Sequence, residues 1–121
     1  MKRKRSRKSL IRELDSVHSL YIRNRDGRCV ICGTTKDLTN GHLFSRTNYS
    51  TRWHERNCHG QCKGCNLRHE FDPYPFNSFF IRKFGQEAWD ELYREHRTVR
   101  KFSNSELAEM ISRYEELTGN K

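Results

Sequence analysis

The sequence predicts an α+β fold in which helices flank a short, turn-rich central section. Apolar residues recur at helical spacing near both ends of the chain, as in amphipathic helices that pack on a core. Between them, residues 27–72 read as short pieces broken by glycines, and this section holds all five cysteines. At 121 residues the chain is long enough for one domain and too short for two ordinary ones. We therefore expect a single domain over residues 9–121.

The composition indicates a fold that needs reinforcement and a partner that is a polyanion. Hydrophobic residues make up 33% of the chain and charged residues 32%, so the core is thin, and small domains of this kind often add a metal or disulfides. The net charge of +9 favours a nucleic acid as partner. One basic run predicts a flexible arm over residues 1–8, with a solvated tail or an import-like tag as the competing interpretation. This run contains Lys2, Arg3, Lys4, Arg5, Arg7 and Lys8.

The chain shows neither a secretory leader nor an apolar stretch of membrane-spanning length. We expect a cytoplasmic protein, in the host cytoplasm if it is viral, with no membrane partner. In such a reducing compartment, paired cysteines more often hold a metal ion than each other.

The first predicted element is an amphipathic helix over residues 9–26. Its apolar positions follow helical spacing, and Asp26-Gly27 supplies a stop signal. These positions are Leu10, Ile11, Leu14, Val17, Leu20 and Tyr21.

Two short cysteine motifs define the central section. Cys29-x-x-Cys32 and Cys62-x-x-Cys65 each present two thiolates from a tight turn, and together they complete a tetrahedral zinc site. A redox Cys-x-x-Cys is the alternative, but that motif occurs once and in a thioredoxin-like context. A site closed by four thiolates has no open position, so the zinc is predicted to stabilise the fold. Cys58 is left over and is interpreted as a small buried apolar residue.

Helices are predicted again over residues 76–118, after a break at Asp72-Pro73-Tyr74-Pro75. Gly85 is a plausible helix C-cap, and Ser103-x-x-Glu106 is a capping box that starts a well-patterned last helix. We expect the aromatic residues of these helices to pack in the core or against a second copy.

The residues between and around the cysteine pairs resemble zinc-stapled HNH (His-Me finger) nucleases. The order is a Cys-x-x-Cys, then a histidine, then an asparagine shortly before a second Cys-x-x-Cys that is followed by His or Asn. Here these positions are His42, Asn57 and Asn66. A narrower resemblance, to the phage NinG (Rap) recombination endonucleases, covers most of the chain. It is carried by Tyr21-Ile22-Arg23-x-Arg25-Asp26, Gly41-His42-x-Phe44-x-Arg46, Arg56-Asn57-Cys58-His59-x-Gln61-Cys62-x-x-Cys65-Asn66 and Thr98-x-Arg100-Lys101-Phe102-x-x-x-Glu106-Leu107.

The resemblance implies a treble-clef ββα-metal core and a DNA endonuclease that acts on branched DNA such as Holliday junctions. His42 is then the general base, and Asn57 orients it by hydrogen bonding. A Mg²⁺ or Mn²⁺ ion stabilises the leaving oxygen, with Asn66 as first choice of ligand and His69 or Glu70 completing its shell. Many HNH proteins carry a ligand just before the base, whereas this chain has Gly41.

Several basic side chains near this site are candidates for contacts with DNA phosphates, and solvated surface residues are the alternative. They are Arg46, Arg52 and Arg56, together with Lys2, Arg3, Lys4 and Arg5 of the arm. His59 is expected either to contact phosphate or to form a structural hydrogen bond. A symmetric junction needs two paired cuts, so we expect a homodimer.

Two other functions remain open from the residues alone. The first is a zinc module of the same fold that binds DNA without cutting it, which Gly41 favours and His42, Asn57 and Asn66 oppose. The second is an RNA-binding zinc ribbon, which explains the arm and the cysteines but not the position of Asn57.

Overall fold

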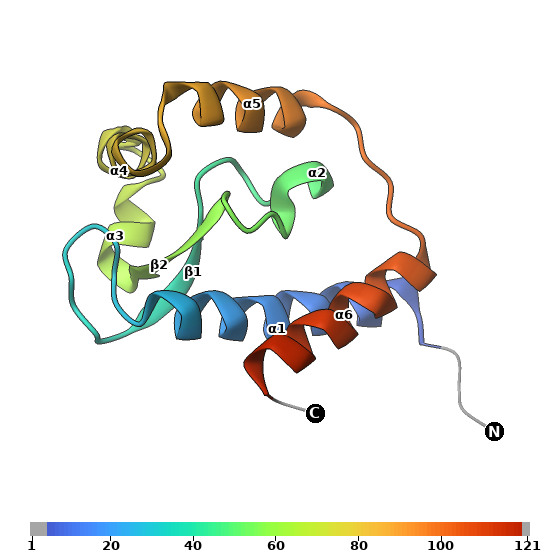
Figure 1. Cartoon of the computed structure of the whole chain (residues 1–121). Helices are drawn as coiled ribbons and strands as arrows, with labels where there is room; N and C mark the ends of the chain where they lie inside the picture. Colours follow the sequence, from blue (N-terminus) through green and yellow to red (C-terminus); the bar gives the residue numbers. More distant parts are fainter. Residues whose placement is uncertain (1–4, 120–121) are drawn as a thin grey trace.

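The structure is a computed structural model that describes residues 5–119. It confirms an α+β arrangement with a helix at each end and a two-stranded sheet between them (Figure 1). Lys2, Arg3 and Lys4 of the predicted arm lie outside the described residues. No helix in the described part of the chain is long and apolar enough to cross a membrane.

The first helix, α1 (Arg7–Asp26), begins two residues earlier than predicted. Ser6 caps it, because the Ser6 hydroxyl accepts a hydrogen bond from the Ser9 amide at 3.1 Å. Arg7 and Lys8 therefore belong to the helix and not to an arm. Gly27 ends it in the left-handed conformation, with φ of 70°, as the predicted stop signal requires.

The central section contains an antiparallel hairpin, β1 (Leu38–His42) and β2 (Cys58–Cys62), whose register pairs His42 with Cys58 and Leu38 with Cys62. The connection between the strands carries the short helix α2 (Tyr49–Arg52), which the sequence did not reveal. The helix α3 (Lys63–Arg68) follows β2 without a break.

Three helices complete the chain: α4 (Tyr74–Phe84), α5 (Gln86–Arg97) and α6 (Asn104–Thr118). The helix α4 begins two residues before the predicted start, because Pro75 occupies its first turn, where a proline lacks only an unneeded N–H. Gly85 ends α4, and Ser103 with Glu106 forms the predicted capping box of α6.

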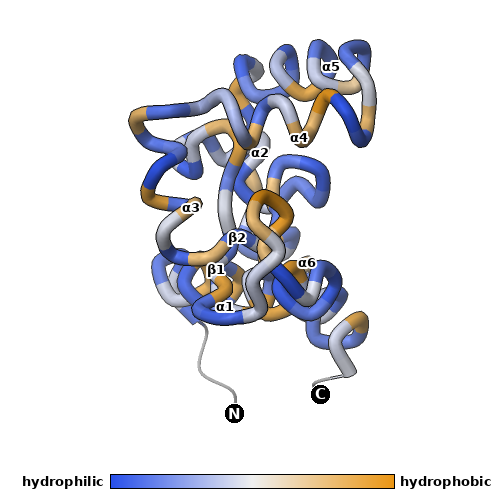
Figure 2. Tube along the Cα trace, turned by 90° about the vertical axis from the view of Figure 1, so that its left-hand side faces the viewer, coloured by the Kyte–Doolittle hydropathy of each residue, from blue (hydrophilic) through white to orange (hydrophobic). Residues whose placement is uncertain are grey.

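Two small apolar cores lie on opposite sides of the hairpin (Figures 1 and 2). In the first, α1 packs against α6, with Leu14, Leu107 and Ile111 buried together with Trp53 from the strand connection. In the second, Phe76 and Phe80 of α4 pack against Leu92 of α5 and Leu43. The hairpin and α3 are therefore held between two helical layers, and this position fixes the site described next.

Candidate metal centre and nucleic-acid cleft

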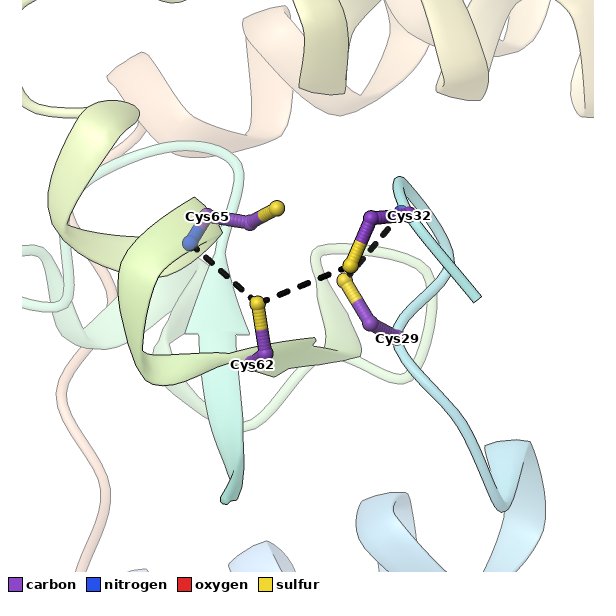
Figure 3. A group of neighbouring side chains, drawn as sticks. All are labelled: Cys29, Cys32, Cys62 and Cys65. Atoms are coloured by element: carbon purple, nitrogen blue, oxygen red, sulfur yellow. Dashed lines mark hydrogen bonds between the residues drawn. The ribbon is translucent and has the colours of Figure 1, made fainter. Parts of the chain in front are cut away.

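The four paired cysteines converge at the open end of the hairpin (Figure 3). Cys29 and Cys32 lie in the turn after α1, Cys62 ends β2, and Cys65 lies in the first turn of α3. Their sulfur atoms all lie within 4.8 Å of one another, and the Sγ atoms of Cys32 and Cys62 are 3.7 Å apart. A tetrahedral ion with Zn–S bonds of ~2.3 Å places its sulfurs ~3.8 Å apart. The cluster therefore fits the predicted structural zinc.

Backbone amides donate hydrogen bonds to two of these sulfurs and so favour the thiolate form that binds a cation. The amide of Cys32 donates to the Cys29 sulfur at 3.5 Å, and the amide of Cys65 donates to the Cys62 sulfur at 3.4 Å. Although burial opposes its ionisation, such amide bonds hold the pKa of Cys29 at about 7. None of the five cysteines forms a disulfide. Cys58 lies outside the cluster and is fully buried, as predicted.

A cleft of about 650 Å³ lies between β1, the residues that follow it, and α3. It brings together five side chains that the sequence singled out, from two separate segments of the chain. These are His42, Arg46, Asn66, His69 and Glu70, joined by Lys63 and others.

The ring of His42 is held in one tautomer. Its Nε2 lies 2.9 Å from the backbone oxygen of Arg52, and because a carbonyl only accepts, Nε2 carries the proton. Nδ1 then holds the lone pair, and it has no hydrogen-bond partner among the described residues. Burial lowers the pKa of His42, and the charges of Arg46 and Arg52 lower it further. The hydrogen bond to the Arg52 carbonyl raises the pKa but does not outweigh these effects. The imidazole is therefore neutral at neutral pH and able to accept a proton.

Asn57 lies near His42 but is not hydrogen-bonded to it, which corrects one expectation from the sequence. Its side chain is completely buried and ties together the connection between the strands. The amide oxygen accepts from the Phe44 amide at 2.8 Å, and the amide nitrogen donates to the carbonyls of Phe44 and Thr51, each at 3.0 Å. Asn57 thus positions the segment that carries the Arg52 carbonyl, and so acts on His42 indirectly.

Asn66 and Glu70 present oxygen atoms to the cleft. The Thr39 hydroxyl donates to the Gln61 carbonyl at 2.8 Å, so it must accept from the Asn66 amide nitrogen, 3.0 Å away. This fixes the Asn66 amide and leaves its oxygen available. Glu70 is exposed and lies in the turn that follows α3. Both residues line the cleft.

His69 is a weaker candidate ligand than the sequence suggested. Its Nε2 donates to the Leu43 carbonyl at 2.9 Å, and its Nδ1 is buried without a partner. Neither nitrogen therefore offers a lone pair to the open cleft. In the described residues, the four cysteines are the only set of three or more His, Cys, Asp or Glu ligand atoms that gather closely enough to hold a metal ion.

Gly41 lies against the side chain of Gln61, which comes from the neighbouring strand β2. A Cβ atom at this position would lie 2.0 Å from the Gln61 Oε1. Gln61 is 1% exposed, and its Oε1 has no hydrogen-bond partner. The place that a ligand side chain at position 41 would take is thus filled from β2, which the alternation of a strand allows but the sequence order does not reveal.

Comparisons with known proteins place this arrangement in a family. A family model described as Bacteriophage Lambda NinG protein matches residues 1–120. The chain belongs to the NinG family. It is similar to Protein ninG of Escherichia phage lambda, with 32% identity over 91 residues, which cover 71% of this chain and 45% of that protein. It is also similar to Protein ninG of Salmonella phage P22, with 30% identity over 95 residues, 74% of this chain and 47% of that protein. The chain thus spans about half the length of these curated relatives. No solved structure matches it.

In this NinG chain, His59 does not lie on the surface, so the structure favours the structural hydrogen bond over the contact with phosphate, the two roles expected for it. It is 1% exposed, and its Nε2 donates to the Arg56 carbonyl at 3.0 Å. Its Nδ1 accepts from Arg25 at 3.1 Å. The neighbouring Asp26 accepts from the Gly60 amide at 2.6 Å, so the end of α1 is bound to β2 through these groups.

The three arginines near the cleft differ in availability. Arg52 forms a two-point ion pair with Asp15, at 3.0 Å and 2.5 Å, and its side chain is only 14% exposed, so its guanidinium is committed to α1. Arg46 pairs with the same carboxylate at 2.9 Å but lines the cleft and is 56% exposed. Arg56 is exposed and stacks over Phe84. Arg5 of the predicted arm pairs with Glu13 at 2.5 Å.

Asp15 is a second structurally important residue that no sequence motif marks. Although burial opposes its ionisation, hydrogen bonds from Arg52 and Trp53 keep the pKa of Asp15 below its usual value. The carboxylate fixes α2 to the middle of α1, and therefore the Arg52 carbonyl that holds His42.

Proposed function

We propose that this protein is a metal-dependent endonuclease that hydrolyses phosphodiester bonds in branched DNA with His42 as general base. The tautomer of His42 supports this most strongly, because Nδ1 is left with a free lone pair beside the cleft. A general base needs such a lone pair within hydrogen-bond reach of the proton that it removes. Nδ1 takes a proton from water, the hydroxide attacks the phosphorus, and the bond to the 3′ oxygen breaks, after which that oxygen takes a proton from solvent water to become a 3′ hydroxyl.

The oxygen atoms of Asn66 and Glu70 form a partial site for Mg²⁺ or Mn²⁺. These hard cations take carboxylate and amide oxygens and fill the remaining positions with water and phosphate oxygens. When bound, the ion neutralises charge that develops on the phosphate and the leaving oxygen. Arg46 and Lys63 line the same cleft and supply charge-assisted hydrogen bonds to the phosphates of the strand.

The order of elements supports an HNH-type core of the treble-clef kind, in which β1, β2 and α3 surround the cleft and zinc staples the two cysteine turns. The resemblance to NinG (Rap) proteins implies that the substrate is a branched recombination intermediate such as a Holliday junction. Paired cuts across a symmetric junction need two active sites, so the proposed working form is a homodimer.

Cleavage of labelled DNA by the zinc-loaded protein tests this function. The substrates are a linear duplex, a fork and a four-way junction of equal arm length, each with Mg²⁺, with Mn²⁺ and with no divalent ion. We expect cutting of the fork and junction in the presence of either ion, and no cutting by the Glu70→Ala variant. The proposal is overturned if the protein cuts none of the substrates with either Mg²⁺ or Mn²⁺.

The second candidate is a DNA-binding zinc module without catalysis. The filled space beside Gly41 favours it, because one position that often carries an ion ligand is closed. A binding module predicts that wild type and His42→Ala bind the junction equally and that neither cuts it. A nuclease predicts equal binding and a loss of cutting in the variant.

A further inference from the structure

A second surface lies on the far side of α2 from the cleft and is centred on Tyr49. Three hollows, of about 430, 220 and 460 Å³, all include Tyr49 in their lining. We call this the Tyr49 surface. It is bordered by the start of α1, the end of α5 and the segment that leads to α6. No residue that lines the cleft with His42 also lines one of these three hollows.

The hollow of about 430 Å³ has an aromatic wall. Tyr49 is 37% exposed and stacks on the buried Trp53, with ring centroids 5.8 Å apart and planes 12° from parallel. Phe102 closes the wall, with its ring edge-on to Trp53 at 5.5 Å. Ser50 and Thr98 line the same hollow, and because their O–H groups donate to the carbonyls of His96 and Arg94, their oxygens are left as acceptors. The hollow thus combines a π-face with hydrogen-bonding groups, as a site for a nucleic-acid base requires.

The hollows on either side of Tyr49 are cationic. Arg7 and Lys8 line one, and Arg97 and Arg100 line the other. All four are exposed, and neither Lys8 nor Arg97 takes part in an ion pair within residues 5–119. An aromatic site with unpaired cations on both sides matches a strand of nucleic acid, whose phosphates flank each base.

We propose that the Tyr49 surface binds a single-stranded segment of DNA, with one unpaired base stacked on Tyr49 and the adjoining phosphates on Lys8 and Arg97. The inference takes its ligand class from the proposed function, but it requires no cleavage. Unpaired nucleotides occur at branch points, so this site explains how a small domain distinguishes branched DNA from duplex. Arg52 links the two sites, since its side chain lines the Tyr49 surface and its carbonyl holds His42.

The test measures DNA binding by the zinc-loaded His42→Ala protein in the absence of Mg²⁺ and Mn²⁺. These conditions separate binding from cleavage. The probes are a fork with two single-stranded arms, carrying 2-aminopurine at the first unpaired position, and a duplex of the same length. We expect binding to quench the 2-aminopurine fluorescence of the fork. Tyr49→Ala is expected to weaken fork binding roughly tenfold and to abolish the quenching, with little change for the duplex.

Two variants serve as controls for Tyr49→Ala. Tyr49→Phe retains the ring and should bind as the parent does. Tyr74→Ala removes a tyrosine that is 75% exposed and lines none of the hollows, and it should leave fork binding unchanged. Lys8→Ala and Arg97→Ala alter only exposed charges, and each should reduce the salt dependence of fork binding by about one unit of slope.

The proposal is overturned if Tyr49→Ala binds the fork as tightly as the parent, or if fork and duplex affinities fall equally. A change in oligomeric state of Tyr49→Ala, with unchanged DNA affinity, would assign the surface to a second copy of the chain instead. Fork binding with the expected quenching, in a wild-type protein that never cuts DNA, would retain this inference and remove the proposed function.

Discussion

Glycine at position 41 is explained by the side chain opposite it. The amide of Gln61 fills the space next to the Gly41 Cα, and a Cβ there would lie 2.0 Å from the Gln61 Oε1. Because Gln61 is buried, its amide has little room in which to move away. This pair accounts for a glycine at the position before His42, since β2 provides the group that fills the space.

Gly41→Ala should therefore destabilise the fold, by about 1–3 kcal/mol, as overpacking does in other cores. Gln61→Ala removes the obstructing group, so the double variant should recover much of the loss that Gly41→Ala causes. Urea unfolding of the four proteins of this double-mutant cycle measures the coupling. Additive effects of the two substitutions would show that Gln61 simply rotates aside.

Asn57 is expected to control His42 without touching it or the substrate. Asn57→Ala leaves the buried Phe44 amide without its partner and removes two bonds to carbonyls, at about 1–3 kcal/mol for each buried group left unpaired. We expect lower stability and, at temperatures where the variant is folded, slower cleavage with unchanged junction affinity. Asn57→Asp retains the acceptor for the Phe44 amide but sets a buried carboxylate oxygen against the carbonyls of Phe44 and Thr51, so it should be at least as destabilised as Asn57→Ala. A stable Asn57→Ala protein that cuts normally contradicts this role.

The position of a residue in the site could be predicted where a local motif marks it. It could not be predicted where the contacts of the residue are with partners far away along the chain. The spacing within each Cys-x-x-Cys fixed which sulfurs converge, and the family pattern placed His42, Asn66 and Glu70 at one cleft. The sequence left the roles of His59 and Arg52 open, because their partners, Arg25 and Asp15, are 34 and 37 residues away. No local pattern marks contacts of that range.

At the scale of elements, local signals predicted helix ends better than they predicted the segment between the strands. Gly27, Gly85 and the Ser103 capping box act where the sequence indicated. Ser6 was overlooked as a cap because the basic run around it suggested a tail. The four-residue helix α2 is too short to show a periodic pattern, and the buried Asn57 amide holds the connection that contains it.

The hairpin and α3 are expected to depend on zinc. Their own burial is small, and structural zinc sites in small domains contribute ~10 kcal/mol or more at neutral pH. Strong chelation or Cys62→Ser should unfold this section, with loss of circular dichroism and of one bound zinc per chain. Cys58→Ala, outside the cluster, should still bind zinc. Chelated protein with an unchanged spectrum would contradict a structural role for the metal.

At the scale of the whole molecule, α1 connects the last helix to the hairpin and to the segment between its strands. It packs along α6 through its apolar face, binds α2 through Asp15, and contacts β2 through Arg25. Its buried face also includes His18, which is 0% exposed and accepts a hydrogen bond from the Asn40 amide at 3.1 Å. A buried histidine at this centre makes the fold sensitive to acid.

Burial lowers the pKa of His18 to about 3, and the neighbouring His42 and Arg25 act in the same direction. The unfolded chain takes up this proton near pH 6.5, so it binds more protons than the folded chain between about pH 3 and 6.5. The free energy of unfolding should fall by about 1.4 kcal/mol for each pH unit below 6.5. His18→Gln should reduce this slope by one proton in urea titrations of zinc-loaded protein, and identical slopes would remove His18 as the cause.

The measurement that tests the central claim most directly is single-turnover cleavage of a four-way junction by His42→Ala, with and without added imidazole. The account predicts the same junction affinity as wild type and a cleavage rate lower by about 10²–10⁴-fold. Imidazole should restore part of the rate, because it supplies the missing base in the space that the substitution opens. Cleavage by His42→Ala at the wild-type rate would contradict the assignment of His42 as the general base.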